Sequence, residues 1–66
     1  MQIFLNGQTL DLTDSISLYQ LLEQQGYAQC RVAVEVNRSI VPKSRHVEHM
    51  LEDGDKVEIV HALGGG

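Results

Sequence analysis

The residues with the most distinctive chemistry are the last three, Gly64-Gly65-Gly66. Glycine has no Cβ, so we expect a flexible tail that reaches about 10 Å and enters channels too narrow for larger side chains. An α-carboxyl group has a pKa of about 3.5 and is anionic at neutral pH. Either the glycines are a frayed end or a remnant of cloning, or the carboxylate of Gly66 is the reacting group and the rest of the chain presents it.

No other residues have the spacing of a catalytic site. No serine lies in a nucleophile-elbow pattern, and no glycine loop has the pattern that cradles phosphate. His46 and His49 can share a helix face with Glu48 or Glu52, but zinc sites need three or four ligands held by a second shell, so we expect ordinary surface histidines. Cys30 has no CxxC partner and is interpreted as a plain strand-edge cysteine. We therefore expect a protein that is not an enzyme, with no catalytic residues, no metal and no bound cofactor.

The length and net charge of the chain limit the classes of partner and of cellular location that we expect. The 66 residues predict a single domain, 1–66, with 64–66 as its tail. The net charge of −4 argues against nucleic acid as a partner. No apolar run approaches the roughly 20 residues of a membrane span, and no signal peptide is visible, so we expect a cytoplasmic protein away from membranes. The late acidic cluster either aids solubility or steers this end of the chain towards a basic patch on a partner; it comprises Glu48, Glu52, Asp53, Asp55 and Glu58.

The first half of the chain predicts a hairpin followed by a helix. Residues 1–6 alternate apolar and polar, and Asn6-Gly7 is the strongest short signal for a type I′ turn. Ser17 is expected to cap the helix in a capping box with Gln20, and Gly26 to end it. The apolar stripe of this helix is Leu18, Leu21 and Leu22.

The second half predicts three further strands. Residues 31–37 form a strand with alternate valines on one face, and Pro42 confines a short strand at 40–41 to a sheet edge. Residues 43–51 are expected to hold one helical turn that buries Val47, Met50 or Leu51. After the tight turn at 53–55, residues 56–63 are the final strand, with Val57, Ile59 and His61 inward and Glu58, Val60 and Ala62 outward.

This order of elements predicts an α+β protein of the β-grasp (ubiquitin-like) type. One main helix crosses a mixed sheet of four to five strands, with the first and last strands adjacent at its centre. Phe4 and Val60 then lie together on the open face of the sheet. Single exposed apolar residues are common, but two beside the strand that leads to the tail favour a partner docking patch.

Four segments of this sequence together resemble the ThiS family of ubiquitin-like sulfur carriers, over nearly the whole chain. They are Val34-Glu35-Val36-Asn37, Ile40-Val41-Pro42, the run Asp53-Gly54-Asp55-Lys56-Val57-Glu58-Ile59-Val60, and Gly64-Gly65-Gly66. One departure is Lys43, where the family commonly has arginine after the proline; this bears on a partner contact and leaves the carrier chemistry unchanged. The resemblance favours the functional interpretation of the glycine tail.

The resemblance implies a carrier in thiamine biosynthesis. A ThiF-type adenylyltransferase would use ATP and Mg²⁺ to adenylate the Gly66 carboxylate. Sulfur from a cysteine desulfurase or related sulfurtransferase would convert it to a thiocarboxylate, and a ThiG-type thiazole synthase would take the sulfur to form thiazole phosphate. The resemblance also implies that Gly64 and Gly65 allow the tail to enter the partner's active site.

Three alternatives stay open on the sequence. A molybdopterin-synthase small subunit is a sulfur carrier with the same fold and a Gly-Gly end. A ubiquitin-like protein modifier would join the same carboxylate to a lysine. A non-covalent interaction module would use only the face carrying Phe4 and Val60.

Overall fold

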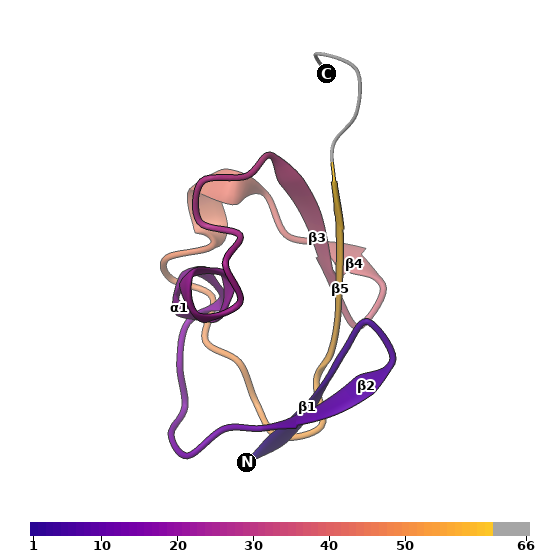
Figure 1. Cartoon of the computed structure of the whole chain (residues 1–66). Coiled ribbons are helices and arrows are strands. Elements are labelled where there is room, and N and C mark those ends of the chain that lie inside the picture. Colours follow the sequence, from indigo (N-terminus) through magenta and orange to yellow (C-terminus); the bar gives the residue numbers. More distant parts are fainter. Residues whose placement is uncertain (62–66) are drawn as a thin grey trace.

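The computed structural model describes residues 1–61, as a curved sheet with one helix lying across one of its faces (Figure 1). Along the chain the elements are β1 (Gln2–Leu5), β2 (Gln8–Asp11), α1 (Leu18–Gln24), β3 (Val32–Val36), β4 (Ser39–Ile40), the 3-10 turn η1 (Lys43–Arg45) and β5 (Lys56–His61). The predicted tail, 64–66, and the predicted end of the last strand, 62–63, lie outside the described residues.

The sheet has five strands in the order β2-β1-β5-β3-β4. β1 and β5 run parallel at its centre, and the other neighbours are antiparallel. β4 is the short edge strand expected before Pro42. The prediction of a mixed β-grasp sheet, with the first and last strands adjacent, is therefore confirmed.

Two tight turns use left-handed backbone. Asn6 and Gly7 have φ of 49° and 84°, as a type I′ hairpin turn between β1 and β2 requires. Asn37 and Arg38 have φ of 52° and 70° between β3 and β4. Asparagine tolerates this region because its short side chain can hydrogen-bond locally, whereas arginine has no such compensation.

Helix α1 begins and ends where the sequence predicts. The Ser17 hydroxyl accepts a 3.1 Å hydrogen bond from the backbone N–H of Gln20, whose side-chain oxygen accepts a 2.9 Å bond from the Ser17 N–H. This reciprocal pair is the expected capping box. Gly26 follows the helix with φ of 84°, a conformation that costs glycine nothing.

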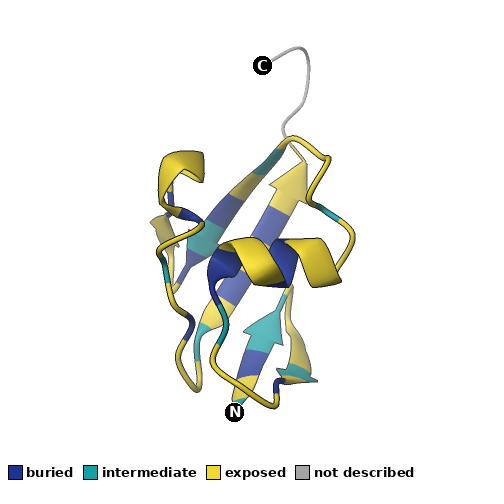
Figure 2. Ribbon diagram, turned by 90° about the vertical axis from the view of Figure 1, so that its left-hand side faces the viewer, coloured by how far each residue is buried: buried dark blue, intermediate teal, exposed yellow. Residues whose placement is uncertain are grey.

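The core lies between α1 and the concave face of the sheet. Figure 2 shows buried residues on the sheet strands behind α1 and on the face of α1 turned towards them. The apolar stripe of α1 and the alternate residues of β3 and β5 supply most of it, as predicted. The buried apolar residues are Ile3, Leu12, Leu18, Leu21, Leu22, Val34, Val36, Val41, Leu51, Val57 and Ile59.

Segment 43–51 holds one helical turn and buries one of its three candidate residues, in agreement with the prediction. Of the three candidates for burial, only Leu51 is buried, at 1% exposure; Val47 and Met50 are 69% and 50% exposed. Only one 3-10 turn forms, so helical periodicity does not decide which side chains face inward. Backbone bonds to the start of α1 fix the segment instead, from Leu18 N–H to the His49 carbonyl and from Leu51 N–H to the Ile16 carbonyl.

Two histidines differ from expectation. His46 is 4% exposed rather than on the surface, and its Nε2 lies 3.0 Å from the Val41 carbonyl oxygen. His61, expected inward, is exposed beyond the end of the core, and its ring centroid lies 5.8 Å from that of Tyr27. Within the described part of the chain, no helix has the length and apolar character to cross a membrane.

Candidate functional site

Strand β5 is the structural base of the candidate site. It lies between β1 and β3 and is the last described element before the residues that contain Gly64, Gly65 and Gly66. Those three glycines lie outside the described residues, so their roles stay predictions.

Asparagines in the turns that follow β1 and β3 hold the backbone of β5. The Asn6 side-chain oxygen accepts a 2.8 Å hydrogen bond from the Ile59 N–H, while the Asn6 N–H donates to the Val57 carbonyl at 2.9 Å. On the other side, Asn37 accepts from the Lys56 N–H through its side-chain oxygen at 3.0 Å and donates its own N–H to the Lys56 carbonyl at 2.8 Å. The strand is thus fixed along most of its described length.

The turn before β5 is organised by Asp55. Its two carboxylate oxygens accept hydrogen bonds from the Asn37 side-chain amide at 2.9 Å and from the Glu52 N–H at 2.8 Å. Gly54 has φ of 88°, which favours glycine. Late acidic residues interpreted as solubilising or steering groups therefore include two with a structural role: Asp55, and Asp53, whose carboxylate accepts a 2.7 Å hydrogen bond from the Gln2 N–H.

Phe4 and Val60 occupy the open face of the sheet, as predicted, but they do not lie opposite each other. Phe4 pairs in register with Lys56, so Val60 is four residues further along β5, a separation of roughly 13 Å. Phe4 is half-buried and Val60 is 58% exposed. Their docking role stays a prediction; the geometry describes a broad face with charged residues between the two apolar positions.

One feature of this face could not be predicted from the sequence. Glu35 on β3 pairs in register with Glu58 on β5, which places two carboxylates side by side on adjacent strands. The alternation of each strand indicates that both point outward, but which two residues face each other depends on the pairing register. That register is set by contacts distant in sequence.

The opposite side of the molecule has a hollow of about 460 Å³, whose lining includes Tyr19, Tyr27, Cys30, Lys43 and His46. The exposed Cys30 thiol lies 3.9 Å from the Gly26 carbonyl oxygen. Among residues 1–61, no three histidine, cysteine, aspartate or glutamate side chains are grouped so that they could hold a metal ion. The His46 ring points inside, so it does not form the surface pair with His49 that the spacing allowed.

Comparison with known proteins gives a consistent result. The model of the ThiS family matches residues 3–66. The sulfur carrier protein ThiS of Escherichia coli is 32% identical over 66 residues, covering both chains completely. A crystal structure of the thiamine biosynthesis protein ThiS from Geobacter metallireducens superposes with a TM-score of 0.87, at 29% identity and full coverage of both chains.

A third relative has a different organisation. The thiazole synthase of Paramagnetospirillum magneticum is 41% identical over 66 residues, which are all of this chain but only 20% of that protein. The chain thus spans about a fifth of the length of this relative. A domain similar to the whole chain is therefore part of a longer polypeptide in that organism.

Proposed function

This chain belongs to the ThiS family, and from that membership we propose that its Gly66 carboxylate is the group that carries sulfur to thiazole synthase. The chain is a sulfur carrier of thiamine biosynthesis and not itself an enzyme. The observation that carries the proposal is the match of the family over residues 3–66, which includes both the β-grasp body and the terminal glycines.

The first step is activation of the terminus. A carboxylate resists nucleophiles at neutral pH because it is anionic. In a ThiF-type adenylyltransferase, a Gly66 oxygen would attack the α-phosphorus of ATP and expel pyrophosphate. The enzyme's Mg²⁺ and basic residues would stabilise the developing charge. The carrier's own contribution is to present a slender end, in which Gly64 and Gly65 clear the walls of the enzyme's channel.

The second step replaces oxygen by sulfur. A persulfide formed by a cysteine desulfurase or related sulfurtransferase would attack the acyl carbon and expel AMP, giving an acyl disulfide. Reduction of that disulfide by a thiol leaves the thiocarboxylate on Gly66. A ThiG-type thiazole synthase then takes the sulfur into thiazole phosphate and returns the carrier as its carboxylate.

The choice of thiazole synthase as acceptor is supported by the relative in which a similar domain is part of a thiazole synthase. Joining two partners in one chain raises their effective concentration, so such a fusion is expected where a carrier and its acceptor meet repeatedly. The same argument favours a thiazole carrier over a molybdopterin-synthase small subunit. The open sheet face carrying Phe4 and Val60 is the proposed docking surface.

The test is thiocarboxylation in vitro with a ThiF-type enzyme, ATP, Mg²⁺ and a persulfide donor. Oxidation of Met1 or Met50 gives nearly the same mass change as exchange of oxygen for sulfur, so exact mass or thiol-selective alkylation mapped to Gly66 is required. Because the Cys30 thiol is exposed, alkylation is performed on the Cys30→Ser variant.

A chain that lacks Gly66 is the control and should carry no alkylated terminus. Conjugates to lysines of other proteins would instead support a protein modifier. Sulfur transfer to a molybdopterin precursor and not to thiazole would support the molybdopterin carrier. If a chain lacking Gly66 still supported normal thiamine synthesis in cells, this result would contradict all three covalent functions. A non-covalent interaction module would then remain.

A further inference from the structure

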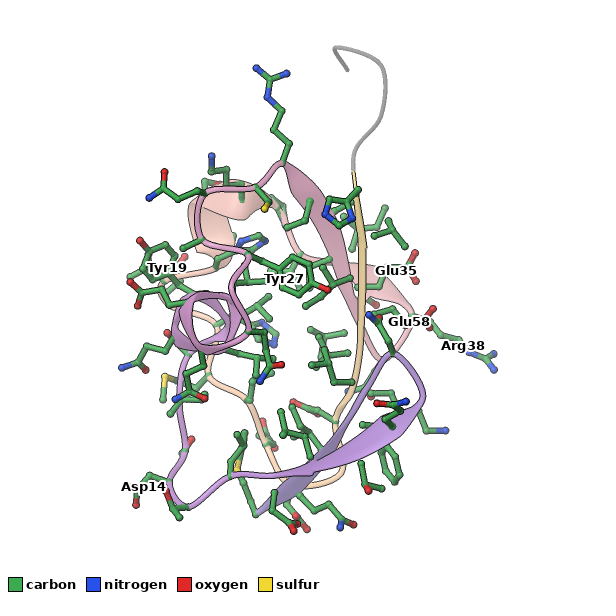
Figure 3. All side chains as sticks on the ribbon, viewed as in Figure 1. Asp14, Tyr19, Tyr27, Glu35, Arg38 and Glu58 are labelled. Atoms are coloured by element: carbon green, nitrogen blue, oxygen red, sulfur yellow. The ribbon has the colours of Figure 1, made fainter. Side chains whose placement is uncertain are left out.

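Two carboxylates lie directly opposite each other on the face of the sheet away from α1. Glu35 and Glu58 are register partners of β3 and β5, and Figure 3 shows both on the side of the sheet opposite α1. The Asn37 N–H donates to the Lys56 carbonyl, so alternation along the antiparallel ladder makes Glu35 and Glu58 a hydrogen-bonded pair as well. Their Cβ atoms are consequently about 5 Å apart.

No side chain in the described part of the chain forms an ion pair with Glu35 or Glu58. The ion pair between Arg45 and Glu48, at 3.3 Å, lies elsewhere. Lys56 is on the same face of β5 and Arg38 is in the turn after β3, but neither forms an ion pair with Glu35 or Glu58. Like charges directly opposite each other in a sheet are unfavourable for folding.

Exposed apolar side chains flank the two carboxylates. In register, Ile40 lies opposite Glu35 and is 71% exposed. Two pairs further towards the end of β5, and therefore on the same face, Val60 lies opposite the exposed Ala33. A guanidinium group matches this surface because it can donate to two carboxylates at once, and its weakly hydrated plane tolerates apolar neighbours.

The chemistry proposed for the chain terminus that follows β5 indicates which partner would bind the two carboxylates. An enzyme that joins the Gly66 carboxylate to ATP brings two anions together and needs an electropositive entrance. Glu58 precedes Gly66 by eight positions, so an extended chain between them spans at most about 28 Å. An enzyme that holds Gly66 therefore lies within reach of the outer face of β5.

We propose that Glu35 and Glu58 form the seat for an arginine of the ATP-dependent activating enzyme, with Ile40 and Val60 as its apolar borders. This inference rests on the proposed function, since it assumes that such an enzyme acts on Gly66. Pairing with a cation relieves the opposed carboxylates, so the face is favourable only in the complex. The two carboxylates also steer this acidic chain electrostatically towards its partner.

The experiment measures ATP–pyrophosphate exchange by a ThiF-type enzyme with the full chain as substrate. The test variant is E35Q/E58Q, and the control is E23Q/E52Q. Both change the net charge by the same amount; Glu23 and Glu52 are exposed, as is Glu58, while Glu35 is half-buried. Circular dichroism melting of each variant shows whether it is folded; removing the opposed charges should leave E35Q/E58Q at least as stable as the parent chain.

We expect E35Q/E58Q to raise KM about tenfold or more with kcat within about twofold, and the control to change neither by more than about twofold. The KM of the parent chain should also rise with added NaCl more steeply than that of E35Q/E58Q. Equal KM values for E35Q/E58Q and the control would overturn the seat while leaving the carrier function intact. Absence of exchange with the parent chain would overturn the proposed function itself.

Discussion

The side-chain amide of Asn37 donates a 2.9 Å hydrogen bond to a carboxylate oxygen of Asp55, across 18 positions of the sequence. This contact joins the turn after β3 to the turn before β5. Both residues belong to segments that carry the family resemblance, so the resemblance has a structural basis here. Asn37 also accepts from the Lys56 N–H, and the two bonds together fix where β5 begins.

Asp55→Ala should destabilise the fold. The substitution leaves the Asn37 amide and the Glu52 N–H without their carboxylate acceptor, and charge-assisted bonds of this kind contribute more than neutral ones. We expect a loss of about 2 kcal/mol in the free energy of unfolding, measured by urea denaturation. Asp14→Ala, at an exposed position, is the control and should change it by less than about 0.5 kcal/mol. Equal stability of the two variants would show that the Asp55 bonds contribute nothing.

The capping box of α1 gives a second prediction. Ser17→Ala removes the acceptor for the Gln20 N–H and should cost about 1 kcal/mol. Gln20→Ala removes the reciprocal bond, so in a double-mutant cycle the two losses should be less than additive by about 0.5 kcal/mol. Ser44→Ala, in the exposed turn η1, is the matched control. Strict additivity would mean that the two hydrogen bonds act independently.

Leu51 and Val47 test which candidate residue of segment 43–51 contributes to the core. Leu51 is buried among the core residues while Val47 is largely exposed. Leu51→Ala should therefore cost about 3 kcal/mol through lost burial and the cavity left behind, and Val47→Ala less than about 0.5 kcal/mol. Chemical denaturation of the two variants measures both values. A larger loss for Val47→Ala would show that Val47, and not Leu51, is the candidate that contributes to the core.

Local signals explain why most of the fold could be predicted. Asn6-Gly7, the Ser17 cap and Gly26 each act on backbone within a few residues of themselves, so neighbouring residues suffice to interpret them. The burial of His46 could not be predicted, because it depends on a carbonyl of Val41 whose position the sheet edge decides. Glu58 is predicted to face outward, and Glu35 alternates with the valines of its strand, but their direct opposition depends on the register between β3 and β5.

Gly65→Leu should separate folding from function. The core that the structure describes is built by residues between Ile3 and Ile59, and Gly65 has no side chain to contribute to it, so we expect the melting temperature to change by less than about 2 °C. Adenylation of Gly66 should fall at least about a hundredfold, because a branched side chain at the penultimate position obstructs a channel shaped for glycine. ATP–pyrophosphate exchange with a ThiF-type enzyme measures this loss. Gly65→Ala, with one added methyl group, should show an exchange rate between those of the parent chain and Gly65→Leu. Exchange by Gly65→Leu at the rate of the parent chain would contradict the role of Gly65 as the residue that clears the channel.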